Sequence, residues 1–137
     1  MNIAPLLAAP PAIQIHLGST LLALVLGTIV LLGRPGTLLH KGGSLHKLLG
    51  RVYVGLMLLA CLSSFLITEI FPGSLSPIHI LSVITPTGLA GAIYAARRGN
   101  IRWHRRAMLI VYWSGLILTG FFTLLPNRLL GQMLFGA

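Results

Sequence analysis

The sequence has almost no acidic residues, because Glu69 is the only Asp or Glu among its 137 residues. Mechanisms that need two carboxylates, such as those of most glycosidases, are therefore excluded. Cys61 is the only cysteine, so an intrachain disulfide framework is excluded as well. We recognise no nucleophile–base pair and no phosphate-binding glycine loop in the sequence, which argues against hydrolytic chemistry.

Charged residues of both signs are also scarce, at 8% of the chain, whereas 55% of the residues are hydrophobic. A soluble domain averages about 25% charged residues, so this composition indicates an integral membrane protein. The length allows one compact unit, and we predict a single membrane domain over residues 1–137. The net charge of +9 does not indicate nucleic-acid binding, because the cations stand at the ends of apolar runs. There they act as topology signals and as contacts for anionic lipid.

The apolar runs predict an all-α integral membrane fold, a bundle of four transmembrane helices. The spans cover about residues 12–33, 45–70, 77–97 and 103–125. Each is long enough to cross a hydrocarbon core of ~30 Å with some tilt. No Lys or Arg precedes the first run, so it lacks the charged region of a signal peptide, and we expect it to be retained as a helix.

The cations are distributed unevenly between the loops. The stretch 96–106 alone holds five of the ten Lys and Arg residues. The first loop and the start of the second span add Arg34, Lys41, Lys47 and Arg51, whereas the loop at residues 71–76 holds none. Loops rich in Lys and Arg stay in the cytoplasm. We therefore predict that the first and third loops are cytoplasmic and that both termini are extracytoplasmic.

Four of the five histidines fall into two pairs according to their depth in this topology. His16 and His79 lie near the outer ends of the first and third spans, and His46 and His104 near the inner ends of the second and fourth. A helical rise of 1.5 Å per residue separates the two levels by roughly 20–25 Å. Residues at helical spacing from each histidine are mostly small or polar, so we expect the four side chains to face the bundle interior.

Two histidines at one depth on facing helices are the minimum that ligates a b-type haem from both axial sides. The sequence therefore predicts two haem b groups. His16 and His79 are the predicted ligands of one haem iron, and His46 and His104 of the other. The predicted function is transmembrane electron transfer, in which haem carries out the redox chemistry and the protein sets its potential.

Three further residues complete the predicted inner site. Gly50 leaves room for a flat macrocycle, and Arg51 and Arg105 are candidates to pair with haem propionates. The predicted partners are the lipid bilayer, anionic lipid at the cytoplasmic face, and a larger membrane complex or a quinone. No nucleic acid is expected.

Two alternatives stay open. Each histidine alone is also typical of an interfacial or hydrogen-bonded role. A zinc or copper site needs three or four ligands, which requires Glu69 to join the outer pair or His40 to join the inner pair. The alternative function is a non-catalytic accessory or assembly subunit of a larger membrane complex, which the near absence of soluble loops favours.

Four segments carry a resemblance to a known family: LHKLLGRVYV at 45–54, SPIHILS at 76–82, ARRGNIRWHRRAM at 96–108 and GFFTLLPNR at 120–128. With its H-x3-G-R and A-R-R-G-N-x3-H-R motifs, the chain resembles a family of small bacterial membrane proteins of unknown function. The resemblance covers nearly the whole chain and implies four helices and a bacterial plasma (inner) membrane, but no activity. The positions of this chain that match the family's motifs are His46, Gly50, Arg51, His79, Arg97, Arg98, His104 and Arg105. Asn127 departs from the glycine expected after the proline. The arrangement of histidines is also similar to that of transmembrane di-haem cytochromes.

Overall fold

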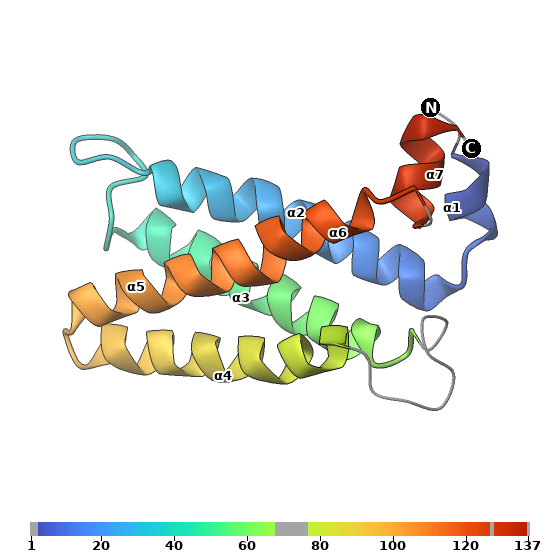
Figure 1. The fold of residues 1–137 in the computed structure, drawn as a ribbon. Helices are drawn as coiled ribbons and strands as arrows, with labels where there is room; N and C mark the ends of the chain where they lie inside the picture. Colours follow the sequence, from blue (N-terminus) through green and yellow to red (C-terminus); the bar gives the residue numbers. More distant parts are fainter. Residues whose placement is uncertain (1–2, 68–76, 127, 137) are drawn as a thin grey trace.

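The computed structural model describes residues 3–67, 77–126 and 128–136, and in these residues all regular structure is helical (Figure 1). The elements are α1 (Ala4–Ala8), α2 (Pro11–Leu32), α3 (Ser44–Ser64), α4 (Pro77–Arg97), α5 (Ile101–Tyr112), the π-helical η1 (Trp113–Leu118), α6 (Thr119–Thr123) and α7 (Leu129–Phe135). Four helical stretches are long and apolar enough to cross a membrane: Pro11–Leu32, Ser44–Ser64, His79–Arg97 and Ile101–Thr123. The prediction of an all-α chain with four transmembrane helices is confirmed.

The second span ends earlier than the predicted residue 70. Helix α3 stops at Ser64, and the amides of residues 65, 66 and 67 bond to carbonyls three residues before them, at 3.1–3.3 Å. Such bonds tighten the last turn of a helix and end its regular ladder. Residues 68–70, and Glu69 among them, lie outside the described residues.

The connection between α4 and α5 reverses the chain within residues 98–100. Gly99 has a φ of +75°, a left-handed conformation that glycine adopts without steric cost. Asn100 caps α5, because its side-chain oxygen accepts a hydrogen bond from the amide of Trp103 at 3.1 Å. This short turn brings the arginines at the end of α4 beside those at the start of α5.

The spans form two hairpins, α2–α3 and α4–α5, with η1 and α6 continuing α5. Most contacts between helices lie within the hairpins, while α3 with α4, and to a smaller extent α2 with η1, join one hairpin to the other. We call this boundary the seam. The end of the bundle that holds both chain termini, where α1 packs against α7, is called the terminal end (Figure 1).

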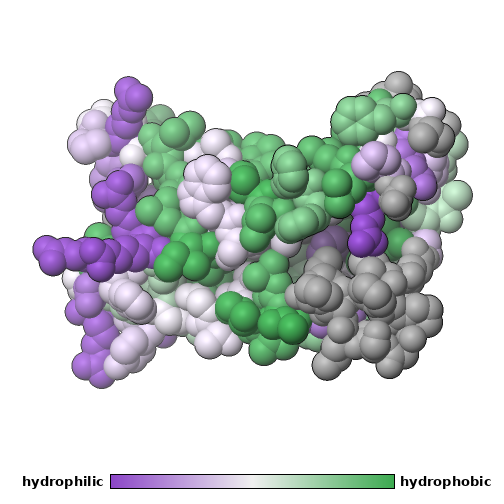
Figure 2. Space-filling view, viewed as in Figure 1, coloured by the Kyte–Doolittle hydropathy of each residue, from purple (hydrophilic) through white to green (hydrophobic). Residues whose placement is uncertain are grey.

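The opposite end of the bundle is the basic end. Its helix termini and loops carry nine of the ten Lys and Arg residues, all of them exposed, and they form the hydrophilic margin on the left of Figure 2. These residues are Arg34, Lys41, Lys47, Arg51, Arg97, Arg98, Arg102, Arg105 and Arg106. Only 17–28% of each span is buried inside the bundle, and the outward surface is mainly apolar (Figure 2). The chain is therefore a multi-pass membrane protein whose spans contact lipid.

The middle of the bundle is packed around two tyrosines. Tyr53 of α3 and Tyr112 of α5 belong to a buried cluster that also draws on α2, α4 and η1. A Cβ atom at Gly27 would lie 2.8 Å from Cε2 of Tyr53 and 3.0 Å from Cδ2 of Tyr112, so α2 approaches both rings closely. The hydroxyls of Thr28 and Tyr112 are 2.7 Å apart and tie α2 to α5.

Replacing Gly27 by alanine should therefore destabilise the bundle. The added methyl group overpacks the contact with both tyrosines, which we expect to cost about 1–3 kcal/mol. Thermal unfolding in detergent measures the effect. The matched control is Gly55→Ala, since nothing lies within 4 Å of a Cβ atom at Gly55. Equal melting temperatures for the two variants would contradict this account of the core.

Candidate functional site

The four predicted histidines lie at the two ends of the bundle, and each hairpin contributes one histidine to each end. The hairpin α2–α3 carries His16 and His46, and the hairpin α4–α5 carries His79 and His104. His16 and His79 belong to the terminal end, and His46 and His104 to the basic end. Each predicted pair therefore joins one hairpin to the other.

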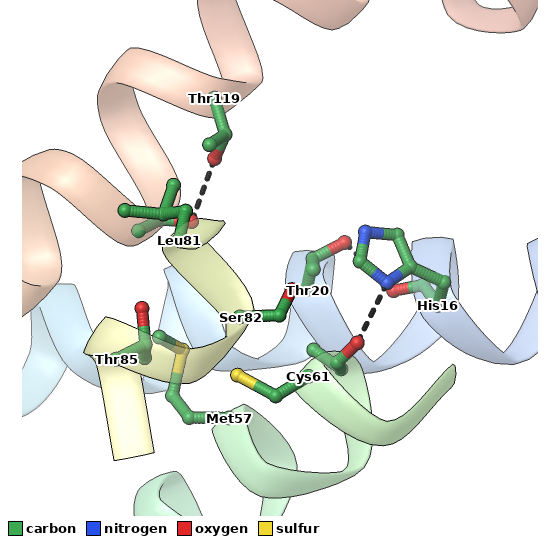
Figure 3. Close-up of a pocket in the computed structure, with 10 residues that line it drawn as sticks. His16, Thr20, Met57, Cys61, Leu81, Ser82, Thr85 and Thr119 are labelled. Atoms are coloured by element: carbon green, nitrogen blue, oxygen red, sulfur yellow. Dashed lines mark hydrogen bonds between the residues drawn. The ribbon is translucent and has the colours of Figure 1, made fainter. Parts of the chain in front are cut away.

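His16 is held by the neighbouring helix of its own hairpin. Its Nδ1 lies 2.9 Å from the carbonyl oxygen of Ala60 (Figure 3). It also lies 3.2 Å from Oγ of Ser63. A carbonyl oxygen can only accept, so Nδ1 of the neutral ring carries the proton and donates it. The lone pair is consequently on Nε2, the nitrogen that these contacts leave for another partner.

His104 shows the same arrangement in the second hairpin. Its Nδ1 lies 2.9 Å from the carbonyl oxygen of Ala92 on α4, so this ring also keeps its lone pair on Nε2. Histidines that bind metal ions commonly donate their other ring N–H to such an oxygen, which fixes the tautomer and the ring orientation. His16 and His104 are therefore both oriented as ligand histidines are.

His46 and His79 are placed differently. His46 lies near the start of α3 and His104 near the start of α5, both at the basic end, and their pairing stays a prediction. Nδ1 of His46 is buried without a hydrogen-bond partner among the described residues. His79 is buried, and its ring centroid is 5.6 Å from that of Phe65. The interactions described for His16 and His79 do not join the two rings, so their pairing stays a prediction.

A cavity of about 40 Å³ lies between the four spans, at the level of His16 (Figure 3). Most of its lining side chains are small or carry a hydroxyl or thiol group. The lining residues are His16, Thr20, Met57, Ala60, Cys61, Leu81, Ser82, Thr85, Gly115 and Thr119. Its volume exceeds the ~10–15 Å³ that a cavity needs to hold one water molecule. The cavity thus lies in the seam beside His16.

Thr85 is the unusual hydroxyl of this cavity. Other lining threonines bond to a carbonyl of their own helix, as Thr20 does to His16 at 2.9 Å and Thr119 to Gly115 at 2.6 Å. Thr85 is only 4% exposed, yet no described residue forms a hydrogen bond with its hydroxyl. The hydroxyl borders the cavity, where a water molecule can serve as its partner.

The π-helical segment η1 forms part of the wall that the last span contributes to the cavity. It supplies Gly115, where a Cβ atom would lie 3.1 Å from Cε of Met57, and it is followed at once by Thr119. A π turn holds more residues than an α turn, which rotates the residues after it relative to those before it. Segments of this kind often mark functional sites. Sequence reasoning missed η1, because no residue pattern distinguishes it from the α-helix on either side.

The remaining predicted residues lie at the basic end. Nothing lies within 4 Å of a Cβ atom at Gly50, so the helix surface there is open. Arg51 and Arg105 are exposed. Glu69 is the only acid of the chain and lies outside the described residues, so no described carboxylate side chain neutralises these cations.

The metal alternative is not supported by the part of the chain that the structure describes. That part contains no group of three or more His, Cys, Asp or Glu side chains that could hold a metal ion. His40 instead folds into its own loop, where its ring packs on Gly43 and its Nδ1 lies 3.2 Å from the carbonyl of Thr37. The zinc or copper site in which Glu69 joins the outer pair of histidines is not tested, because Glu69 lies outside the described residues.

The hydroxyls of Ser64 and Ser82 are 2.6 Å apart and form a direct tie across the seam. We expect Ser64→Ala to lower the free energy of unfolding by about 0.6 kcal/mol, the average for a side-chain hydrogen bond between membrane helices. Thr85→Val should not destabilise the protein, because it removes a hydroxyl that has no partner. Chemical unfolding in detergent compares the two variants. A larger loss for Thr85→Val than for Ser64→Ala would show that Thr85 has an essential partner.

A family model described as a predicted membrane protein (DUF2306) matches residues 13–135 of the chain. No curated protein and no solved structure matches the chain. The match agrees with the four spans and assigns no activity to the histidines.

Proposed function

The chain belongs to the DUF2306 family of predicted membrane proteins, and we propose that it is a transmembrane electron-transfer protein with two b-type haem sites. His16 and His79 are the proposed ligands of the terminal-end site, and His46 and His104 those of the basic-end site. The observation that carries the proposal is the anchoring of His16 and His104 through Nδ1, which directs the lone pair on Nε2 away from the anchoring helix.

The donor groups fit a haem with two axial histidines. Neutral imidazole is a common axial ligand of haem iron, and the hydrogen bonds of His16 and His104 fix the tautomer that ligation needs. No described group forms a hydrogen bond with Nδ1 of His46. Each proposed site takes one ligand from each hairpin, so a haem at either site would lie in the seam and join the hairpins.

The space for a macrocycle has to come from the seam. The cavity of about 40 Å³ is far smaller than a haem, so the structure as described has no space for the macrocycle at the terminal-end site. Contacts between the hairpins are fewer than contacts within them, so the seam is where a separation would disrupt the fewest contacts. At the basic end, the open surface at Gly50 provides part of the room.

When bound, haem supplies one-electron redox chemistry. The chain supports it in three ways. Its histidines supply the axial ligands of the two sites. The buried layer around Tyr53 and Tyr112 separates the two sites and excludes water. Arg51 and Arg105, which are exposed at the basic end, are candidates to pair with propionates there. We further propose that the basic end faces the cytoplasm of a bacterium, in contact with anionic lipid of the plasma membrane.

A second candidate function is that of a non-catalytic subunit in a larger membrane complex. The small cavity favours it, since a space of about 40 Å³ is far too small for a haem. The outward surface of the spans would then pack against partner helices instead of lipid.

Absorption spectra of the purified protein separate the two candidates. We expect a b-type Soret band that shifts on reduction with dithionite. His16→Ala and His79→Ala should each remove the same part of the spectrum, and His46→Ala and His104→Ala the complementary part. His40→Ala is the control and should leave the spectrum unchanged. A well-folded, colourless protein would refute the haem proposal and favour the subunit.

Topology can be tested independently of any cofactor. Reporter fusions at Lys41 and Gly99 should report a cytoplasmic location, and a fusion after Gly136 an extracytoplasmic one, because cation-rich loops are retained inside. Protease protection in oriented vesicles provides a second measurement of which loops face each side of the membrane. A cytoplasmic signal from the fusion after Gly136 would reverse the proposed orientation and leave the pairing of histidines intact.

A further inference from the structure

We propose that the cavity beside His16 is a binding site for one Cu⁺ ion, with His16, Met57 and Cys61 as its ligands. The proposal does not rest on haem. It assigns to the cavity, which has no space for a macrocycle, a ligand of its own size. Copper and haem would both use Nε2 of His16, so the two exclude each other at this site, whereas the basic-end site is unaffected.

Helix α3 supplies the two sulfur ligands. Met57 and Cys61 are four residues apart, so they lie on one face of the helix, about one turn from each other. Both side chains are buried and both line the cavity (Figure 3). The described lining residues include no Asp, Glu, Lys or Arg, so the two sulfur atoms lie among uncharged groups.

The nitrogen ligand is already oriented. Nδ1 of His16 donates to the carbonyl oxygen of Ala60, the residue before Cys61, at 2.9 Å. This contact holds the imidazole against the turn of α3 that carries the thiol, and it leaves the lone pair on Nε2. His16 also lines the cavity. All three ligands therefore belong to the hairpin α2–α3, and binding does not require the hairpins to separate.

The second hairpin provides room and a hydroxyl group opposite these ligands. A Cβ atom at Gly115 would lie 3.1 Å from Cε of Met57 and 3.6 Å from Oγ1 of Thr85, so these two side chains meet at the space that glycine leaves. Thr85 is 4% exposed, and its hydroxyl forms no hydrogen bond with a described residue. A hydroxyl that borders the cavity can donate to a thiolate or to a water molecule, as the outer partners of metal ligands do.

The donor set selects the metal. Thiolate and thioether sulfur are soft ligands that favour Cu⁺, and imidazole also suits copper. Zn²⁺ is usually held by four ligands, and Ca²⁺ and Mg²⁺ take oxygen ligands. Because two of its three donors are sulfur atoms, this site differs from the zinc or copper sites that require Glu69 or His40.

The charge of the site favours the same ion. The thiolate is the form of cysteine that binds metal, so Cu⁺ displaces the proton of Cys61, the proton passes to solvent, and no electron is transferred. One positive charge enters as another leaves, and the filled site is as neutral as the empty one. A divalent ion would leave an unpaired charge inside the bilayer, which is costly.

Competition for Cu⁺ between the haem-free protein and a chelator of known affinity, under reducing conditions, tests the proposal. A haem-deficient host supplies the protein, and one Cu⁺ ion per chain is expected to bind. Cys61→Ser and Met57→Leu should each weaken binding by more than roughly 100-fold, which is the upper end of the cost of losing an outer-shell partner. The matched control is Met133→Leu, because Met133 is also buried but is not among the residues that line the cavity. Thermal unfolding in detergent verifies that each variant is folded.

The pH dependence of the affinity provides a second measurement. Release of one proton per ion predicts that the affinity rises about tenfold per pH unit, as long as the thiol is protonated in the empty protein. The proposal is overturned if the haem-free protein binds no Cu⁺, if its affinity does not change with pH, or if Cys61→Ser or His16→Ala binds as tightly as the unchanged chain. The proposed function is judged separately by the Soret band of protein from a haem-sufficient host, so either proposal can fail without the other.

Discussion

The lack of hydrogen-bonding solvent inside the bilayer governs this structure more than any other constraint. Hydroxyl groups in the spans bond to carbonyls of their own helices, as Thr28 does to Leu24 at 2.7 Å. The imidazoles of His16 and His104 bond to carbonyls of the adjacent helix. Each of these histidines therefore joins two helices and still keeps a lone pair for a ligand. The hydroxyl of Tyr53 and Nδ1 of His46 are buried without described partners and mark where the bundle departs from this rule.

Sequence reasoning predicted most of the fold, because the signals involved are local. Four apolar runs separated by short polar or cationic loops are enough to set the number of spans, and the depth of each histidine follows from helical rise. The end of the second span was not predictable in the same way. The sequence remains apolar beyond Ser64, but bonds to carbonyls three residues back end the helix there. Hydropathy does not record that change in hydrogen bonding.

The site was less predictable, because its features depend on contacts between helices. Spacing indicated that His16 faces the interior, but not that it would bond to α3 of its own hairpin. The tautomer of His104 depends on the carbonyl of Ala92, twelve residues earlier in the chain. The π-helical segment η1 changes the rotation of the last span without a recognisable residue pattern. The close approach of Gly115 to Met57 likewise appears only in three dimensions.

The cations of the basic end affect both the insertion of the bundle into the membrane and the electrostatic surroundings of His46 and His104. Positive loops decide which side of the membrane a bundle faces, and that decision depends only on where Lys and Arg lie along the chain. Arg51 and Arg105 also lie close in sequence to His46 and His104, and charge acts on any group within its range. A chain that uses cations to fix its orientation therefore also makes its two ends electrostatically unequal.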